Sequence, residues 1–254
     1  MAEPDTTPAT RSPDRSDSPP DQPASPNDRP GSPSDRPAPP SAPSAASPSA
    51  PPADASAEPT PAPFTPRRLL LFGTGALSVA FLPFWLNWLR LTHPETEVRV
   101  AVTRSAERFV SRVALRSLVG GEVLLDAWPD GTGPSGAGQI DHVELAAWPD
   151  AVAVHPAGLH FLARFAQGAA DTPVLMALQC TRAVIGIAPA LPPGAEQGPA
   201  YRRHVKELDQ YDNVLIAPPH PGRSASTGRN DASAAAPLPA LLALIERRFT
   251  RGEG

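Results

Sequence analysis

The stretch "LLLFGTGALSVAFLPFWLNWL", residues 69–89, decides the fold of this chain. It contains no charged residue and follows Arg67 and Arg68. A bilayer core needs about 20 apolar residues, and basic flanks favour the cytoplasmic side, so a membrane span is one interpretation. The other is a buried strand that turns into a helix, because Gly73-Thr74-Gly75 interrupts the stretch after a short β-type run.

Strand and helix patterns alternate along the rest of the chain. Short apolar runs occupy residues 141–146 and 150–156, strand patterns occupy residues 97–103, 183–190 and 213–218, and helix patterns occupy residues 105–120, 157–167, 171–178, 201–208 and 238–248. This alternation predicts a mostly parallel sheet covered on both faces. The expected fold class is therefore α/β, a three-layer Rossmann- or flavodoxin-like sheet with helices on both faces. Residues 69–72 would be its buried first strand, which favours the strand over the membrane span.

The segment at residues 105–120 is expected to be one continuous helix. Ser105 is placed to cap it, and Phe109, Val110 and Val113 fall on one helical face.

The first 66 residues have a different composition from the rest. They hold 20 of the 36 prolines, nine acidic against four basic side chains, and Phe64 as a single aromatic. Such a segment cannot bury enough apolar surface to offset its chain entropy. We expect residues 1–66 to be a disordered tail rich in Pro, Ala and Ser, and residues 67–254 to form one domain.

Composition also narrows the function classes. Cys180 is the single cysteine, which excludes an internal disulfide framework and a cysteine-cluster metal site, so no metal is expected. The folded part is close to neutral and has no basic stripe, which argues against a nucleic-acid partner. The first 30 residues are polar and proline-rich, unlike a secretory signal, so a cytoplasmic protein is expected.

Three later stretches carry a resemblance to a known family. They are His142-Val143-Glu144-Leu145, Pro156-Ala157-Gly158-Leu159-His160 and Pro189-Ala190-Leu191-Pro192, whose first residues are 14 and 33 positions apart. Their order and spacing resemble the homo-oligomeric flavin-containing cysteine decarboxylases, over roughly residues 67–218. That family includes the epidermin-type lanthipeptide decarboxylases, which this chain resembles more closely, and phosphopantothenoylcysteine decarboxylase.

The resemblance implies roles for individual residues. His142 would be the catalytic base, although a structural histidine at a strand end is the alternative. FMN is the implied cofactor, with FAD left open, and its expected contacts are Gly73, Thr74, Gly75, Thr103, Ser105, Phe109, Ala157 and Gly158. The expected substrate contacts are His160, Pro189, Leu191 and Pro192. His160 and Pro192 stand where the family has asparagine, so the way in which the substrate carboxylate is held must differ here.

The implied activity is oxidative decarboxylation of the C-terminal cysteine of a ribosomally made lanthipeptide precursor, giving an aminoenethiol for an aminovinyl-cysteine ring. The implied partners are the precursor peptide, further copies of the chain as a trimer or dodecamer, and other lanthipeptide-modifying enzymes. Residues 218–237 suit a flexible lid or loop, and they lack the cysteine with which the coenzyme A branch reduces its product. A phosphopantothenoylcysteine decarboxylase-like enzyme and a non-catalytic flavin-binding regulatory protein remain the alternatives.

Overall fold

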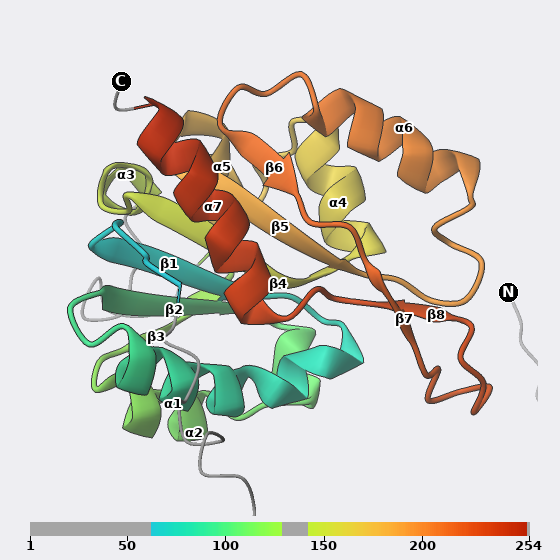
Figure 1. Cartoon of the computed structure of the whole chain (residues 1–254), viewed down its shortest axis with the longest axis horizontal. Coiled ribbons are helices and arrows are strands. Elements are labelled where there is room, and N and C mark those ends of the chain that lie inside the picture. Colours follow the sequence, from blue (N-terminus) through green and yellow to red (C-terminus); the bar gives the residue numbers. More distant parts are fainter. Residues whose placement is uncertain (1–61, 129–141, 253–254) are drawn as a thin grey trace, which may run out of the picture. The chain divides into compact units, whose positions relative to one another are not determined.

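A computed structural model describes residues 62–128 and 142–252 (Figure 1). Within them, parallel strands form one six-stranded sheet in the order β3-β2-β1-β4-β5-β6. Its strands are β1 (Arg68–Gly73), β2 (Glu97–Thr103), β3 (Val123–Asp126), β4 (Ala151–Gly158), β5 (Val184–Ala190) and β6 (Val214–Ile216). The strand order reverses direction between β1 and β4, which is the place where doubly wound sheets bind ligands. The predicted α/β class is confirmed.

Helices cover both faces of this sheet (Figure 1). One face carries α3 (His142–Ala147), α4 (Leu159–Ala166), α5 (Pro173–Cys180) and α6 (Pro199–Leu208). The other carries η1 (Leu77–Phe81), α1 (Leu82–Thr92), α2 (Arg112–Val119) and α7 (Leu238–Gly252). Successive strand residues point to opposite faces, so Leu70 and Phe72 enter the first core and Leu69 and Leu71 enter the second.

The apolar stretch at residues 69–89 is therefore a strand, a turn and a helix. Its strand part, β1, is the third strand of the sheet and is buried on both faces, which explains why it carries no charge. Pro83 lies in the first turn of α1, where its missing N–H costs no hydrogen bond. Among the described helices, none has the length and apolar character needed to cross a bilayer.

Residues 105–120 do not form the single helix that was expected. A short turn, η2 (Ala106–Arg108), is followed by extended backbone at Ser111, with φ −84° and ψ 129°, before α2 begins. This break changes the phase of the helix, so Phe109 is 42% exposed and Val113 is 76% exposed, while Leu115 is buried. The predicted apolar face is therefore wrong for Phe109 and Val113.

Two other boundaries differ from the sequence pattern. The apolar run at residues 141–146 falls mostly in helix α3. The helix expected from residue 157 begins at Leu159, because β4 continues through Ala157 and Gly158 to pair with β5. Pairing with a neighbouring strand outweighs local helix propensity at these two residues.

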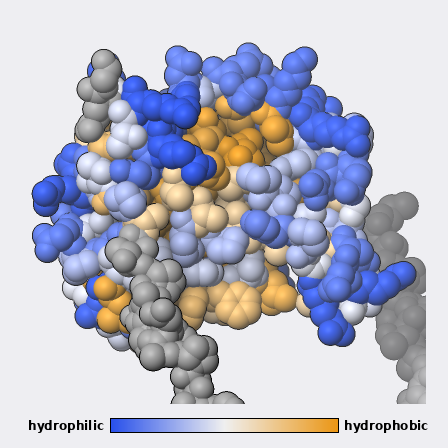
Figure 2. Space-filling model, viewed as in Figure 1, coloured by the Kyte–Doolittle hydropathy of each residue, from blue (hydrophilic) through white to orange (hydrophobic). Residues whose placement is uncertain are grey.

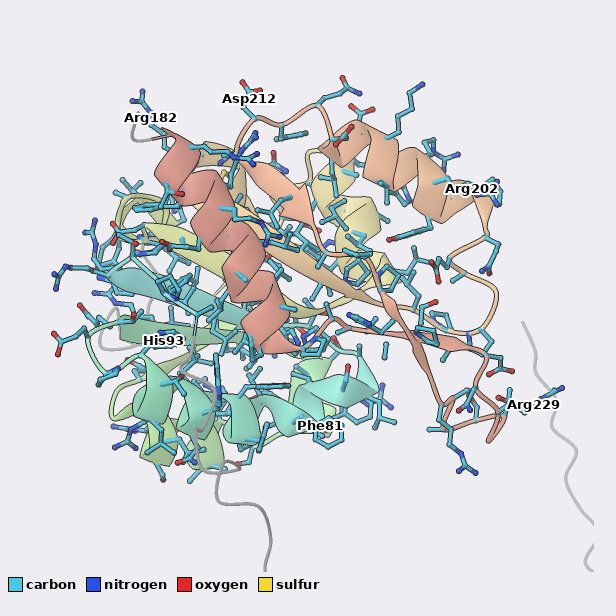
Figure 3. All side chains as sticks on the ribbon, in the orientation of Figure 1. Phe81, His93, Arg182, Arg202, Asp212 and Arg229 are labelled. Carbon is cyan, nitrogen blue, oxygen red and sulfur yellow. The ribbon has the colours of Figure 1, made fainter. Side chains whose placement is uncertain are left out.

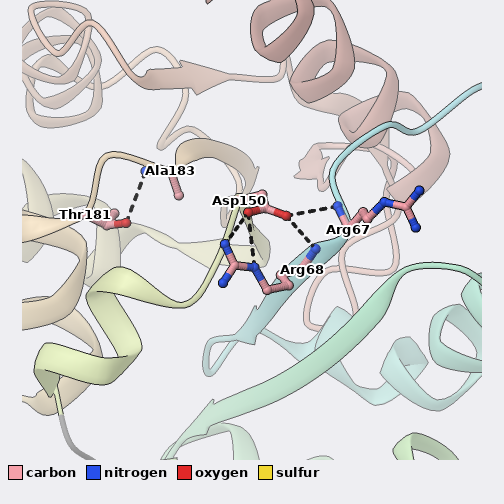
Figure 4. A network of polar contacts seen from close by, with 5 residues as sticks. All are labelled: Arg67, Arg68, Asp150, Thr181 and Ala183. Atoms are coloured by element: carbon pink, nitrogen blue, oxygen red, sulfur yellow. Dashed lines mark hydrogen bonds and ion pairs between the residues drawn. The ribbon is translucent and has the colours of Figure 1, made fainter. Parts of the chain in front are cut away.

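Asp150 connects the starts of β1 and β4 (Figure 4). Its carboxylate accepts hydrogen bonds from the backbone N–H groups of Arg67 and Arg68, at 3.1 and 2.9 Å, and from the Arg68 guanidinium at 2.7 Å. Burial alone would raise the pKa of Asp150, but the hydrogen bonds and charge of Arg68 outweigh it and lower the pKa. The carboxylate therefore stays ionised and holds the register of the two central strands.

The folded domain begins a few residues before Arg67. Phe64 packs against the core beside the ring of His93, with centroids 5.8 Å apart. Thr65 donates from its backbone N–H and its hydroxyl to the Glu246 carboxylate, at 2.7 and 2.6 Å. These contacts join the segment before β1 to α7.

We predict that stability depends on whether an N-terminal truncation ends at residue 61 or at residue 66. Removal of residues 1–61 should leave the thermal midpoint unchanged, because their composition cannot support a packed core. Removal of residues 1–66 should lower stability by about 1–2 kcal/mol, a few degrees in Tm, because the Thr65 to Glu246 hydrogen bonds and the Phe64 contact are lost. Calorimetry of both variants tests this, and equal midpoints would contradict it.

His155 connects the end of β4 to the segment that leads into α7. Its Nε2 lies 2.8 Å from the carbonyl oxygen of Ala236, and because that oxygen only accepts, Nε2 carries the proton. Nδ1 is buried and has no hydrogen-bond partner among the described residues. Burial lowers the pKa of His155, although the hydrogen bond to Ala236 opposes the shift.

This histidine should make stability depend on pH. The unfolded chain takes up a proton at His155 near pH 6.5, whereas the folded chain resists it, so stability should fall as pH drops below about 6.5. His155→Gln keeps a donor for Ala236 but does not titrate. We expect the stability lost between pH 7.5 and 5.5 to be about 1 kcal/mol smaller in this variant than in the wild type. Urea unfolding at both pH values measures it, and an identical loss in both proteins would contradict the assignment.

Candidate functional site

The candidate site lies at the carboxyl edge of the sheet, where β1 and β4 meet. Thr74 follows β1 and is 2% exposed. Its hydroxyl donates to the carbonyl oxygen of Pro156 at 2.8 Å and accepts from the Gly158 N–H at 2.9 Å. The Thr74 hydroxyl therefore both donates and accepts a hydrogen bond within the protein. Thr74 holds the ends of β1 and β4 together rather than offering a free side chain to a ligand.

The loops after β1 and β2 touch each other beside this edge. The Thr103 and Ser105 hydroxyls are 3.0 Å apart, and Thr103 accepts a hydrogen bond from the Ala106 N–H at 3.2 Å. A Cβ added at Gly75 would lie 2.2 Å from the Ser105 Oγ. Because glycine has no Cβ, it is the residue at position 75 that allows the two loops to lie this close together.

A hollow of about 530 Å³ opens at the same edge. One wall follows the turn after β1, with Gly75, Leu77 and Phe81. The others come from the β4–α4 junction, from the residues after β5, and from an antiparallel hairpin of β7 (His220–Gly222) and β8 (Ala232–Ala234). This volume lies in the range of cofactor and small-ligand sites.

The residues around the hollow fit the flavin that the sequence motifs imply. The first turn of η1 has no side-chain cap and no acidic residue, so its N–H groups can face an anion. None of the described residues that line the hollow is Asp or Glu. Leu77, Phe81, Leu191 and Pro192 supply apolar surface for an aromatic ring system, and Ser78 supplies a hydroxyl.

Comparison with known proteins agrees with this geometry. The sequence profile of the family described as Flavoprotein matches residues 59–249. The chain belongs to the Flavoprotein family. The resemblance drawn from the three motif stretches is thereby confirmed at the level of the family.

One curated relative and two solved structures are similar to this flavoprotein over most of its folded part. It is 37% identical over 179 residues to the cypemycin cysteine dehydrogenase (decarboxylating) of Streptomyces sp, which covers 70% of this chain and 90% of that one. The crystal structure of the cypemycin decarboxylase CypD is 33% identical, with a TM-score of 0.58 and coverage of 76% and 99%. The FMN-dependent cysteine decarboxylase TvaF from thioviridamide biosynthesis is 27% identical, with a TM-score of 0.56 and coverage of 72% and 98%.

The structure brings many of the residues predicted from sequence to one place. Of the predicted site residues, those that line the hollow are Gly75, Gly158, His160, Leu191 and Pro192. Others support its edge from within, namely Gly73, Thr74, Ala157 and Pro189. Thr103 and Ser105 lie on the adjoining loop. These residues follow the carboxyl ends of parallel strands, which lie at the same edge of the sheet.

His142 and Phe109 lie apart from the walls of the hollow. His142 begins α3, is half-buried, and stands with its ring 5.7 Å from the ring of Trp128. Trp128 is 40% exposed and Val143 is 64% exposed, so exposed apolar side chains lie next to this histidine in space and in sequence. Within one copy of the flavoprotein, His142 is therefore not a wall residue of the hollow that contains His160.

The sequence predicted a flexible lid or loop at residues 218–237 but gave no sign that this segment contains a hairpin. The strands β7 and β8 contain Pro, Gly, Ala and Ser instead of the β-branched residues typical of strands. Tertiary contacts hold the hairpin instead: Leu191 and Ser233 exchange backbone hydrogen bonds of 2.8 and 3.2 Å, and the Ser233 hydroxyl bonds to the Glu196 carboxylate. Arg223, which belongs to this wall, was not predicted as a site residue.

We predict that Gly75→Ala lowers the flavin content of the purified protein strongly. The new Cβ would overlap the Ser105 hydroxyl and push apart the loops after β1 and β2. Ser105→Gly in the same protein removes the overlap and should restore flavin content. Gly121→Ala is the matched control, because a Cβ there meets nothing within 4 Å. Visible absorbance per protein chain measures the effect, and an unchanged spectrum in Gly75→Ala would contradict it.

Proposed function

We propose that this flavoprotein is a cytoplasmic, FMN-dependent enzyme that oxidatively decarboxylates the C-terminal cysteine of a ribosomally made lanthipeptide precursor. The product would be an aminoenethiol, the precursor of an aminovinyl-cysteine ring. The observation that carries the proposal is the hollow at the β1/β4 edge, built from the motif stretches around Gly158 and Pro192 and closed by the hairpin. Its support comes from the similarity to two peptide-pathway decarboxylases, of cypemycin and of thioviridamide biosynthesis.

The proposed chemistry divides into oxidation and loss of carbon dioxide. A bound flavin supplies the two-electron acceptor. The terminal cysteine loses a hydride from Cβ and a proton from sulfur, which gives a thioaldehyde. The bond between Cα and the carboxylate then breaks, its electron pair forms a Cα=Cβ double bond, and the sulfur is left as an enethiolate that takes up a proton. The peptide has lost CO₂ and two hydrogens.

The protein must provide an acceptor for the thiol proton, and His142 is the proposed one. A histidine suits this task because its ordinary pKa lies near the working pH. Since His142 is not in the wall of the hollow of its own chain, we propose that it serves the hollow of a second copy. The exposed Trp128 and Val143 beside it suit a contact between copies of the chain.

His142→Asn should retain fold and yellow colour while the decarboxylation of cysteine-ended peptides is lost. A general base typically contributes about 10² to 10⁴-fold in rate, so an end-point assay by mass spectrometry suffices. A peptide that ends in serine should be inert, because thiol oxidation precedes decarboxylation. A fully active His142→Asn protein would remove His142 from the reaction. A wild-type protein that binds flavin but converts no such peptide would favour a non-catalytic, regulatory role.

Mixed oligomers test whether His142 acts between copies. A chain with His142→Asn lacks the proposed base but has an intact loop at Gly75. A chain with Gly75→Glu has a disrupted loop there but keeps His142. If the site is shared, mixing the two inactive proteins should restore part of the activity, because some hollows combine an intact loop with a partner's histidine. The formation of mixed oligomers is verified by mass. If these oligomers recover no activity, His142 and the loop at Gly75 act within one chain.

A further inference from the structure

Arg223 is the one permanently charged side chain among the described residues that line the hollow. It follows β7 directly, on the hairpin, and is exposed to solvent. The remaining titratable group in these walls is His160, and no wall residue is acidic. The hollow therefore has a positive charge on its hairpin side.

The guanidinium of Arg223 has no partner among the described residues. The charged side chain nearest in sequence, Arg229, lies near the turn of the same hairpin, 3.8 Å from the Asp231 carboxylate (Figure 3). Arg223 instead lies along the turn, where its Nη2 is 3.9 Å from the place that a Cβ on Gly228 would take. Its fork of N–H donors is available to a ligand in the hollow.

The hairpin holds Arg223 in a defined position. At its base, Ser233 and Leu191 pair through their backbones, and the Ser233 hydroxyl bonds to Glu196. At its turn, the Ser224 N–H donates to the Arg229 carbonyl at 2.8 Å and the Gly228 N–H donates to the Ser224 carbonyl at 2.9 Å. Arg223 lies between these two fixed points.

The wall formed by the residues after β5 offers no comparable donor to an anion. Pro192 and Pro193 have no N–H group, and the Leu191 N–H already donates to Ser233. Leu77 and Phe81 extend the apolar surface from the hollow onto the outside, and Figure 2 shows apolar surface along η1 and α1 at the lower edge of the view. Among the described wall residues, Arg223 is therefore the permanently charged partner for an acidic group that enters this hollow.

We propose that Arg223 binds the C-terminal carboxylate of the substrate peptide and so selects a cysteine at a chain end over an internal one. This inference rests on the proposed function, which requires a free carboxylate on the reacting residue. An arginine fork matches a carboxylate with two parallel hydrogen bonds, which a lysine or a histidine cannot reproduce. Arg223 is a positioning residue, because it holds the group that leaves and takes no proton or electron.

The proposal is tested on the flavin-loaded protein by comparing two unreactive peptides as inhibitors. The two peptides differ only in their C-terminal group. Short synthetic peptides, randomised before a C-terminal cysteine, first identify one sequence that the wild type decarboxylates. That sequence is then made with serine in place of cysteine, as the free acid and as the amide, and both are measured as inhibitors. We expect the acid to bind the wild type about tenfold more tightly than the amide, as for a hydrogen-bonded ion pair.

Arg223→Gln should bind the acid and the amide equally, at the level of the wild-type amide, and Arg223→Lys should keep part of the preference. For the cysteine substrate, Arg223→Gln should raise KM about tenfold and leave kcat within about twofold, because the ion pair is already made in the ground state. Arg229→Gln, on the same hairpin but outside the walls, should behave as wild type in every measurement.

Each outcome decides a separate point. If the wild type converts none of the randomised peptides, the proposed function fails and the inference falls with it. If the wild type is active and Arg223→Gln keeps the preference for the acid, the inference alone is overturned. Loss of that preference in His160→Gln, with retention in Arg223→Gln, would transfer the role to His160.

Discussion

The hydroxyl of Thr74 makes the contact on which the candidate site depends. It bridges the Pro156 carbonyl and the Gly158 N–H, so it joins the end of β1 to the end of β4 where the strand order of the sheet reverses. Because Thr74 is almost fully buried, no water competes for these hydrogen bonds. The turn after β1 and the β4–α4 junction thereby become two fixed walls of one hollow.

The candidate site combines the rigid carboxyl edge of the sheet with the β7–β8 hairpin. Strand ends provide the floor, and their positions follow from a sheet that is buried on both faces. The hairpin has little strand propensity of its own and is held by Leu191, Glu196 and, just beyond β8, by the bond from His155 to Ala236. Such a hairpin can carry a specificity residue such as Arg223 without any change in the sheet. One fold can serve several substrates in this way.

His142 and the walls of the hollow belong to different elements of the fold. His142 starts α3, whose buried Leu145 joins the core on the α4 and α5 face, while the hollow lies at the ends of β1, β4 and β5. The apolar side chains around His142 and at the mouth of the hollow remain exposed within one copy. Exposed apolar surface of this kind is stabilised by association, which agrees with a site completed by self-assembly.

The sequence by itself determined the class of fold and most of the edge. Alternating periodicities predicted the parallel sheet, and Gly73 and Gly75 marked the end of its first strand, because these signals are local. Gly158 was implied only by the family resemblance. Only the tertiary structure decided that the helix expected at residues 105–120 breaks at Ser111, which exposes Phe109 and Val113, and that residues 220–234 pair as a hairpin. Strand pairing and the placement of Arg223 and Pro192 in the walls of one hollow depend on contacts between residues far apart in the chain. A local pattern cannot encode such contacts, because their energy exists only once the chain has folded.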